Sequence, residues 1–418
     1  MPLDKNETSD FDIIIAGGGL VGGSLALALS GSSLRTAVIE PISPSEFEQS
    51  SFDNRTIALS HGSCKILHAL GIWDSLNLTK SIWPIRKIHI SEQGRFGTAL
   101  IDHYEQGVPE LGFVIKSRDL GFAIWQHLQD KPNVELICPA KVSSTLMGSN
   151  LRKVDITSNN SNFSATTSLL VAADGSRSKL RQQLNITTKE FDYNQVAVVA
   201  NLGIDPHRSA NTAYERFTPD GPLAILPGPD GRYSLVMAIS ATNANSILEL
   251  DDDDFLKMLQ NSFGYRLGKF RKIGRRIGYP LSLLVAKNLF AERAVLVGNA
   301  SNTLHPVAAQ GFNLGLRDIA CLAELIADGM NLDRRNFDIG GLDLLQSYSE
   351  WRESDQGRVV QFTDGLIRGF RPVDSLSANI RGLALASFDI FPGAKKILAH
   401  HTMGLSGRST RLTRGLSL

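Results

Sequence analysis

The sequence predicts an α/β protein that combines a parallel sheet, an inserted and mainly antiparallel sheet, and a helical C-terminal region. Three observations lead to this fold class. A strand–glycine turn–helix–strand unit opens the chain, a second strand–loop–helix unit begins near Ala294, and short strands without long helices lie between the two. The length of 418 residues exceeds what one hydrophobic core usually holds, so more than one domain is expected.

The opening unit begins with two short apolar runs that are typical of buried strands. Ile13–Ile15 forms the first run and Ala37–Ile39 forms the second. Between them, Val21, Leu25 and Leu29 recur at helical spacing. The order of strand, helix and strand predicts a Rossmann-like βαβ unit with a parallel pair of strands.

The turn between the first strand and its helix has the spacing Gly17-x-Gly19-x-x-Gly22. Glycines at these positions allow a sharp turn, a close approach of the backbone to a pyrophosphate, and tight packing of helix on strand. Glu40 follows Gly22 by eighteen residues and is placed to accept hydrogen bonds from a ribose. The unit therefore predicts a dinucleotide site, and glycines that serve packing alone are the alternative.

Two charged residues beyond the opening unit are further candidates. Arg55 lies just past a polar loop and could hold a phosphate, although a salt bridge to a loop acid explains it equally well. A helix is expected from Ser117. Asp174 and Gly175 follow an apolar run at 169–173, where the carboxyl ends of parallel strands bind ligands. An ordinary turn is the alternative for that pair.

The middle of the chain has a different pattern. Strands are expected over 85–104 and again between 196 and 239, joined by turns without long helices, which predicts a mainly antiparallel sheet. Asp251–Asp254 is expected to be the solvated start of a helix, because acidic side chains are favoured in the first turn. No other potential ligand flanks these acids, so no metal site is expected.

The second strand–loop–helix unit follows the sheet region. An apolar run at 294–297 closes on Gly298 and Asn299, a loop covers 301–310, and a helix is expected from Gly311 to near Gly329. The nucleotide-binding domain is therefore expected to be discontinuous. The expected ranges are 1–80, 112–184 and 285–340 for that domain, 81–111 and 185–284 for the sheet domain, and 341–418 for the C-terminal region.

The C-terminal region combines apolar residues with cations. Apolar side chains are frequent from Leu383 to Phe391, and the last residues carry Arg408, Arg411 and Arg414. This combination suits a helix that lies on an anionic lipid surface. A helix that docks on its own protein, or on a partner, is the alternative.

Composition narrows the class of protein. The net charge of +1 does not suggest a nucleic-acid partner. Three widely spaced cysteines show no metal-binding or redox spacing, which predicts buried thiols in a reducing, cytoplasmic environment. The polar N-terminus does not resemble a signal peptide, and no apolar run is long enough to span a bilayer.

Four of these stretches occur in one order that is known from a family. They are the glycine unit with Glu40, the Asp174–Gly175 pair, the segment 298–313, and the spacing Leu345-x-x-Tyr348-x-x-x-Arg352-x-x-Asp355. In this order the chain resembles the single-component flavin aromatic hydroxylases. Longer stretches extend the resemblance to their ubiquinone-biosynthesis branch over nearly the whole chain; they are 53–59, 215–224, 263–269 and 296–318.

The resemblance implies FAD as cofactor, NADH or NADPH as a transient reductant, and O₂ as co-substrate. It implies hydroxylation of a polyprenylated methoxyphenol in ubiquinone biosynthesis. It also implies FAD contacts beyond the glycine unit, which would come from Arg55, Arg118, Asp174, Gly175, Gly298, Asn299, Pro306, Gly311, Phe312 and Asn313. The wider family has an aspartate where this chain has Asn299. The amide keeps hydrogen bonding but lacks the charge.

Candidates for the chemical step are few. His305 lies in the loop expected near the flavin and could polarise the phenol, although a structural histidine is the favoured interpretation. Arg216 and Tyr279 could line the substrate cavity, and a role on a sheet face explains them equally well. No other residue stands out as a catalytic base.

Three other functions remain open at this point. The chain could catalyse another hydroxylation step of the same pathway, reduce a prenyl group with its flavin, or serve as a non-catalytic scaffold of a quinone-synthesis complex. The lack of paired cysteines argues against a disulfide substrate. Contacts with other quinone-biosynthesis enzymes, or with the inner membrane through the C-terminus, are expected partners in these interpretations.

Overall fold

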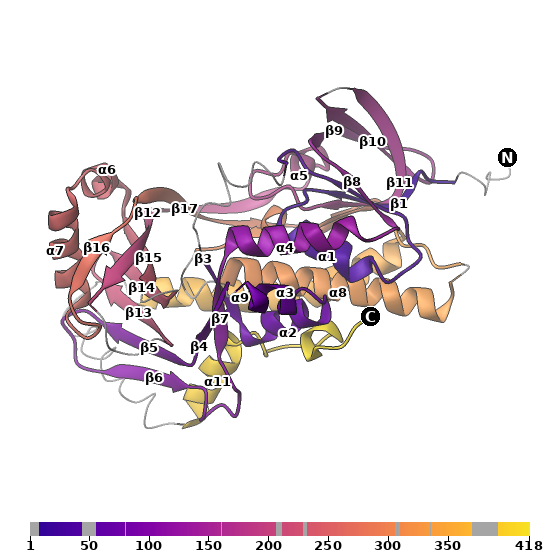
Figure 1. Cartoon of the computed structure of the whole chain (residues 1–418). Helices are drawn as coiled ribbons and strands as arrows, with labels where there is room; N and C mark the ends of the chain where they lie inside the picture. The colour runs from indigo at the N-terminus through magenta and orange to yellow at the C-terminus, as the bar shows by residue number, and fades with distance from the viewer. Residues whose placement is uncertain are drawn as a thin grey trace.

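The predicted fold class is confirmed by the computed structural model, in which two large sheets are joined by helices (Figure 1). The structure describes residues 8–43, 56–79, 81–159, 161–205, 211–228, 232–305, 307, 310–334, 336–369 and 392–418. Two predicted contact residues, Arg55 and Pro306, and the apolar stretch from Leu383 to Phe391 lie outside the described residues.

In the described part of the chain, eight strands form the first sheet, whose central order is β18-β19-β11-β1-β2-β8. The pairs that join β19, β11, β1, β2 and β8 are parallel, as the opening βαβ unit predicts. The strands β9 and β10 extend β11 as an antiparallel hairpin. The bounds are β1 Phe11–Ala16, β2 Thr36–Ile39, β8 Val134–Ile137, β9 Ala140–Met147, β10 Arg152–Ser158, β11 Asn162–Ala172, β18 Phe290–Ala291 and β19 Ala294–Leu296.

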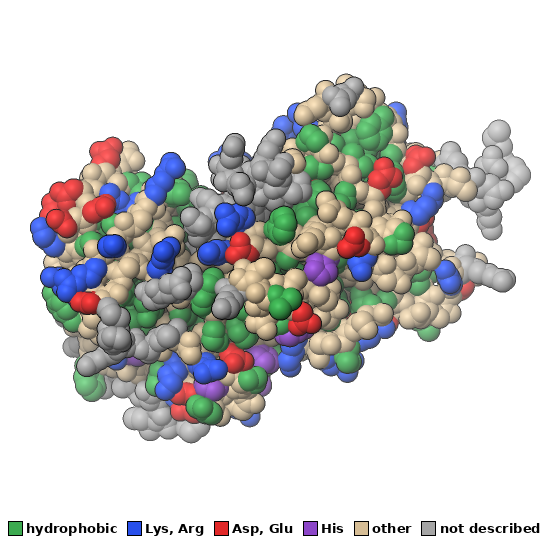
Figure 2. All heavy atoms as spheres, viewed as in Figure 1, with side chains coloured by type: hydrophobic (Ala, Val, Ile, Leu, Met, Phe, Trp, Pro, Cys, Tyr) green, Lys and Arg blue, Asp and Glu red, His purple; other side chains and the backbone are tan. Residues whose placement is uncertain are grey.

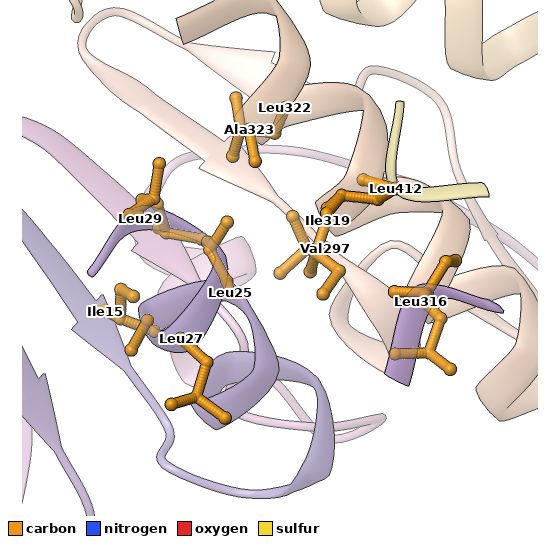
Figure 3. Close-up of a cluster of buried hydrophobic side chains, with 14 of the residues drawn as sticks. Ile15, Leu25, Leu27, Leu29, Val297, Leu316, Ile319, Leu322, Ala323 and Leu412 are labelled. Carbon is orange, nitrogen blue, oxygen red and sulfur yellow. The ribbon is translucent and has the colours of Figure 1, made fainter. Parts of the chain in front are cut away.

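Helices cover this sheet and bury its apolar face. In Figure 3, Leu25 of α1 lies against Val297 and Ile319 of the β19–α8 unit, and all three side chains are fully buried. The helix α8 ends at Leu332, slightly beyond the predicted end. The bounds are α1 Leu20–Leu29, α2 His61–Ala69, α3 Trp73–Leu78, α4 Ser117–Gln129, α5 Lys179–Gln183, α8 Gln310–Leu332 and α9 Leu342–Gly369.

Nine strands of the described chain form the second sheet, with the main order β20-β17-β12-β15-β14-β13-β5-β6 and β16 beside β12. Every pair is antiparallel except β13 with β5, which agrees with the predicted mainly antiparallel sheet. The bounds are β5 Lys87–Glu92, β6 Thr98–Asp102, β12 Thr188–Ile204, β13 Thr212–Thr218, β14 Gly221–Pro227, β15 Arg232–Ser240, β16 Phe270–Ile273, β17 Ile277–Ala286 and β20 Asn302–Thr303.

Two helices, α6 (Ala244–Leu248) and α7 (Asp252–Phe263), cover one face of this second sheet. The predicted acidic helix start is confirmed, because the Asp251 side chain caps α7 by accepting a hydrogen bond from the Asp254 N–H. Figure 2 shows acidic side chains gathered at this end of the molecule, with basic side chains interspersed. The opposite face of the sheet points towards the first sheet and forms one end of a cavity.

A small sheet and the C-terminal segment connect the two large sheets. The small sheet consists of β3 (Thr56–Ser60), β7 (Gly112–Lys116) and β4 (Ile82–Ile85), all antiparallel. The helix α11 (Pro392–Thr402) lies beside β4, β5 and β7, as Figure 1 shows. Ala399 of this helix and Met403, which directly follows it, are buried. No helix among the described residues is long and apolar enough to cross a membrane.

Two cations of the C-terminal tail, Arg408 and Arg411, contact their own chain. Arg411 forms ion pairs with Glu324 at 3.2 Å and Asp328 at 2.5 Å. The Arg408 guanidinium lies 3.8 Å from the centre of the Trp351 ring. Of the two interpretations of this tail, docking on its own protein therefore accounts for these two arginines.

Candidate active site

A cavity of about 920 Å³ runs between the two large sheets. Six of the predicted contact residues border it, namely Gly19, Gly175, Asn299, Gly311, Phe312 and Asn313. We call its two ends the glycine-lined end and the sheet end. The glycine-lined end is formed by Gly19, Gly175, Asn299 and Gly311. The sheet end is formed by cavity-facing residues of β5, β13 and β14, namely Ile88, Ile90, Glu215, Ala224 and Leu226.

The three fingerprint glycines have different tasks. Gly17 has φ of +105°, and a Cβ at Gly22 would lie 1.9 Å from the Gly17 carbonyl oxygen. These two glycines therefore allow the turn and the close packing of α1. A Cβ at Gly19 would meet no atom within 4 Å, and Gly19 borders the cavity. The α1 N-terminus has no side-chain cap and no acidic residue in its first turn, so its N–H groups can serve an anion.

Glu40 is buried directly behind the glycine turn. Its carboxylate accepts hydrogen bonds from the Gly18 N–H at 2.7 Å and from the Ile42 N–H at 3.0 Å. Burial raises the pKa of Glu40, and these two hydrogen bonds oppose that shift. The indole of Trp125 holds the same turn from the other side by donating to the Gly18 carbonyl at 2.8 Å. Glu40 therefore fixes the turn and does not itself border the cavity, and the ribose contact stays a prediction.

Asp174 and Gly175 end strand β11 at the carboxyl edge of the sheet. Gly175 has φ of +82°, borders the cavity, and leaves open space where a Cβ would lie. The Asp174 carboxylate accepts a hydrogen bond from the Leu180 N–H at 3.3 Å and so orients the following turn. Of the predicted pair, Gly175 therefore borders the cavity and Asp174 supports the turn.

The second strand–loop–helix unit meets the glycine turn in space. Gly298 has φ of +59°, and a Cβ there would lie 3.0 Å from the Val21 side chain of α1. Asn299 is exposed and borders the cavity, as do Gly311 and Phe312 at the start of α8. Segments about 280 residues apart in the sequence therefore form one wall, as the two strand–loop–helix units predict.

Asn313 connects the start of α8 to the small sheet. Its side-chain oxygen accepts a hydrogen bond from the Ser60 N–H, and its side-chain nitrogen donates to the Ala58 carbonyl, both at 2.9 Å. Asn313 is only 2% exposed. Because both partners are backbone groups of β3, this amide fixes where the helix begins relative to the cavity.

A buried charged network supports the wall from behind. Arg352 donates to Asp318 at 2.8 Å and to Asp355 at 2.6 Å, and Arg317 donates to Asp355 at 2.9 Å. Asp318 also accepts the Gly298 N–H at 3.0 Å. Burial raises the pKa of Asp318, and the charge of Arg352 opposes that shift. Arg352 and Asp355 of α9 therefore hold the loop after β19 in place through Asp318.

The His305 side chain does not border the cavity, where a role in the chemical step would require it to lie. It is only 1% exposed, its ring packs edge-on against Tyr193, and its Nδ1 accepts the Val307 N–H at 3.2 Å. Burial lowers the pKa of His305 to about 4, so the ring is neutral near pH 7. The neighbours Leu304 and Val307 border the cavity, whereas His305 does not. The structural interpretation of this histidine therefore fits the geometry.

The two predicted substrate contacts also lie outside the cavity. Arg216 points to the opposite face of its sheet, where it donates to the Ser262 carbonyl at 2.9 Å and to Ser91 Oγ at 3.1 Å. Tyr279 lies on β17 and does not border the cavity either. Successive side chains of a strand point to opposite faces, so Glu215 faces the cavity where Arg216 cannot. The expectation that Arg216 lines the cavity is corrected accordingly.

Arg118 is the remaining predicted contact in the described chain. Its side chain is 44% exposed and lies 3.5 Å from Asp119, and the preceding Ser117 borders the cavity. The structure thus places Arg118 next to a cavity residue and not on the cavity wall itself.

No group of three or more potential metal ligands is found within the described ranges.

The glycine-lined end fits a flavin dinucleotide. A Cβ at Gly19, Gly175 or Gly311 would meet nothing within 4 Å, so the wall is an open trough of backbone. Uncapped N–H groups at the start of α1 border the same trough and can hold a pyrophosphate. The apolar walls beyond the trough suit a planar ring system.

Comparison with known proteins identifies the family to which this chain belongs. The FAD binding domain family model matches residues 10–363. The chain belongs to this family. It is 33% identical to the ubiquinone hydroxylase UbiL of Rhodospirillum rubrum over 423 aligned residues, covering 100% of this chain and 96% of that protein. It is 30% identical to the ubiquinone hydroxylase UbiM of Neisseria meningitidis, covering 94% and 84% of the two chains.

The solved structures agree with this assignment at the level of fold. The p-nitrophenol 4-monooxygenase PnpA of Pseudomonas putida DLL-E4 superposes with a TM-score of 0.78 at 17% identity, covering 96% of this chain and 99% of that one. The chain is a flavin-dependent aromatic hydroxylase that uses FAD, and it belongs to the branch that includes the ubiquinone hydroxylases.

Proposed function

We propose that this protein hydroxylates the ring of a polyprenylated methoxyphenol in ubiquinone biosynthesis, using NADH or NADPH and O₂. The cavity is the observation that carries the proposal. The wall is mainly apolar between the glycine-lined end and the sheet end, and α9 and α11 add Phe362, Leu366 and Leu398. A volume of about 920 Å³ accommodates a phenol ring together with part of a long apolar tail.

We assign the contacts with FAD to residues that border the trough and to Glu40, which lies behind the glycine turn. Gly19 and the uncapped first turn of α1 would hold the pyrophosphate. Glu40 would contact the ribose. Gly175 and Asn299 would contact the chain between the pyrophosphate and the ring. Gly311, Phe312 and Asn313 would face the ring. Bound FAD supplies the acceptance of hydride from the nicotinamide and the activation of O₂.

The protein's own contribution is orientation and exclusion of water. The start of α8 borders the trough through Gly311 and Phe312, and the positive end of the helix dipole favours negative charge on a group bound there. The apolar side chains of the sheet end keep water from the ring. We propose that the expected domain ranges separate these two tasks between the nucleotide-binding part and the sheet part.

The test is mass spectrometry of quinone intermediates in a strain that lacks this protein. The expected result is accumulation of a prenylated phenol that lacks one oxygen atom, and its mass names the step. Complementation with the wild-type gene and with Gly22→Ala provides the matched pair, because the second variant is expected to lose FAD. Quinone synthesis that continues without an accumulated phenol would contradict the proposal.

The same strains separate the other candidate functions. Rescue by Gly22→Ala without bound FAD would support a scaffold. Product formation that does not need O₂ would support reduction of a prenyl group. Contact of the C-terminal segment with the inner membrane, or with other quinone-biosynthesis enzymes, stays a prediction, and co-sedimentation with anionic vesicles tests the first of these.

A further inference from the structure

One carboxyl group faces the cavity from the sheet end. Glu215 lies on β13, directly opposite Ala224 of β14 on one side and Ile90 of β5 on the other. All three border the cavity. Its strand neighbours Ala213 and Phe217 face the same way, so the carboxyl group projects from an apolar floor.

The surroundings of Glu215 contain no partner for its charge. Glu215 is the only acidic or basic residue among the described residues that border the cavity. Its side chain makes no hydrogen bond or ion pair with another described residue. Tyr214 also borders the cavity and can titrate, but its ring packs against Phe263 of α7 on the opposite face of the sheet.

An unpaired carboxyl group on an apolar surface is costly unless a ligand uses it. We propose that Glu215 receives the phenolic hydroxyl of the substrate and accepts its proton. This assignment rests on the proposed hydroxylase function and names the group that orients and activates the ring. Arg216 cannot take this role because it faces α7.

The proposed step is a proton transfer without a change in oxidation state. The phenol O–H bond breaks, a bond forms between that proton and a carboxylate oxygen of Glu215, and the negative charge passes to the phenol oxygen. The ring becomes richer in electrons at the carbons ortho and para to that oxygen. Those carbons then react more readily with an electrophilic oxygen atom.

The environment gives Glu215 a suitable proton affinity. Burial raises the pKa of Glu215 to about 7, and no neighbouring charge opposes the shift. A base is most effective when its pKa lies near the working pH. Because the unprotonated form is the active one, activity is expected to rise with pH through about 7.

The first test compares the wild-type holoenzyme with Glu215→Gln. The variant keeps the shape of the side chain and is expected to lower kcat/KM for hydroxylation about 100-fold or more, because it cannot accept a proton. The pH-dependent limb near 7 should disappear in Glu215→Gln and persist in Glu215→Asp. Glu190→Gln is the matched control, since Glu190 is an exposed residue of β12 in the same sheet.

The second test uses binding alone and does not need turnover. A prenylated 2-methoxyphenol and its methyl ether are titrated into holoenzyme, and binding is followed through the flavin absorbance. Above pH 7 the phenol should bind about tenfold or more tightly than the ether, because a hydrogen bond to a charged group contributes about 1.5–3 kcal/mol. This preference should vanish in Glu215→Gln.

The outcomes separate the two proposals. A Glu215→Gln holoenzyme with wild-type kcat/KM and an unchanged pH profile would overturn the role of Glu215 and leave the hydroxylase function intact. Wild-type protein that hydroxylates no prenylated phenol, yet prefers phenol over ether through Glu215, would overturn the function and keep the binding role. Equal binding of phenol and ether to wild-type protein would overturn the assignment of Glu215. If Glu215→Gln fails to bind FAD, wild-type protein alone still tests the assignment. The ratio of its affinities for the phenol and the ether should then rise with pH through 7, and a ratio that does not depend on pH would overturn the role of Glu215.

Discussion

The glycine-lined end and the sheet end of the cavity are built by different means. At the glycine-lined end, backbone forms the wall, and the positions that shape it, such as Gly17 and Gly22, have no room for a methyl group. At the sheet end, side chains form the wall, and alternate residues of β5, β13 and β14 face the cavity. One end is therefore fixed by close packing of backbone on backbone, and the other is adjustable by side-chain exchange.

This difference implies different sensitivities to mutation. The glycine-lined end also depends on the charged network of Asp318, Arg352 and Asp355, which holds the Gly298 N–H from behind. The sheet end has an empty space next to its side chains, so a shortened side chain there loses fewer contacts. Mutations at the two ends should therefore separate cofactor binding and stability from substrate preference.

The largest effect is expected for Arg352→Ala. Removal of this guanidinium leaves Asp318 buried without its main partner, which should lower the free energy of unfolding by about 3–5 kcal/mol. Urea unfolding of the purified protein measures it. Arg271→Ala is the matched control, because the exposed pair of Arg271 with Asp205 is worth about 0–1 kcal/mol. Equal losses for the two variants would contradict the supporting role of the network.

The next effect is expected for Gly22→Ala. The added Cβ would lie 1.9 Å from the Gly17 carbonyl oxygen, so α1 must shift. We expect a loss of about 1–3 kcal/mol in stability and a protein that is purified with little FAD. Gly31→Ala is the matched control, because nothing lies within 4 Å of its Cβ position. A Gly22→Ala protein that is yellow and has wild-type stability would contradict the claim that close backbone packing shapes the glycine-lined end.

The pH dependence of stability tests the structural interpretation of His305. The pKa of its folded form lies at about 4, below the ordinary 6.5, so the unfolded chain binds more protons in that interval. Its contribution to stability is complete above 6.5 and is lost as the pH falls through 4. The slope from this one group reaches at most about 1.4 kcal/mol per pH unit.

The measurement is urea unfolding of wild type and His305→Gln between pH 4 and 7. The variant should show a flatter dependence on pH over this interval while it retains hydroxylation activity within a few-fold. A variant that folds normally and loses activity by orders of magnitude would instead give His305 a chemical role.

The smallest effect on stability is expected at the sheet end and its neighbouring helices. Leu366→Ala removes a partly buried side chain that borders the cavity, which should cost about 1 kcal/mol and change KM for a prenylated substrate more than FAD content. Leu322→Ala, in the fully buried core on α8, should cost about 2–5 kcal/mol. Thermal unfolding and steady-state kinetics of the pair measure both effects, and equal stability losses would contradict the distinction between the two sites.

The sequence predicts the glycine-lined end well because its signals are local. Gly17, Gly19 and Gly22 lie within one turn and its helix, and their spacing carries the requirement for close backbone approach. The sheet end carries no such signal. Glu215 and Arg216 are adjacent, and only the pairing of β13 with β5 and β14 decides which of them faces the cavity.

Two other features depend on tertiary contacts that the sequence does not contain. The sequence predicted that the loop of His305 lies near the cavity and favoured a structural role for the histidine itself. Leu304 and Val307 of that loop do border the cavity, and the fold decides the orientation of the ring, which is buried against Tyr193. Cations near the C-terminus suggested a lipid surface, whereas Arg408 and Arg411 find Trp351, Glu324 and Asp328 on helices far away in the sequence. Partner identity over such distances follows from the fold and not from local composition.

Incorporation of ¹⁸O shows whether the protein transfers an oxygen atom from O₂ to the phenol ring. Purified holoenzyme is incubated with NADH or NADPH, a prenylated methoxyphenol and ¹⁸O₂, and the product is analysed by mass spectrometry. One ¹⁸O atom is expected in each product molecule, and this product should be lost in Glu215→Gln. A product that carries oxygen from water, or a reaction that proceeds equally well without O₂, would contradict the proposed function.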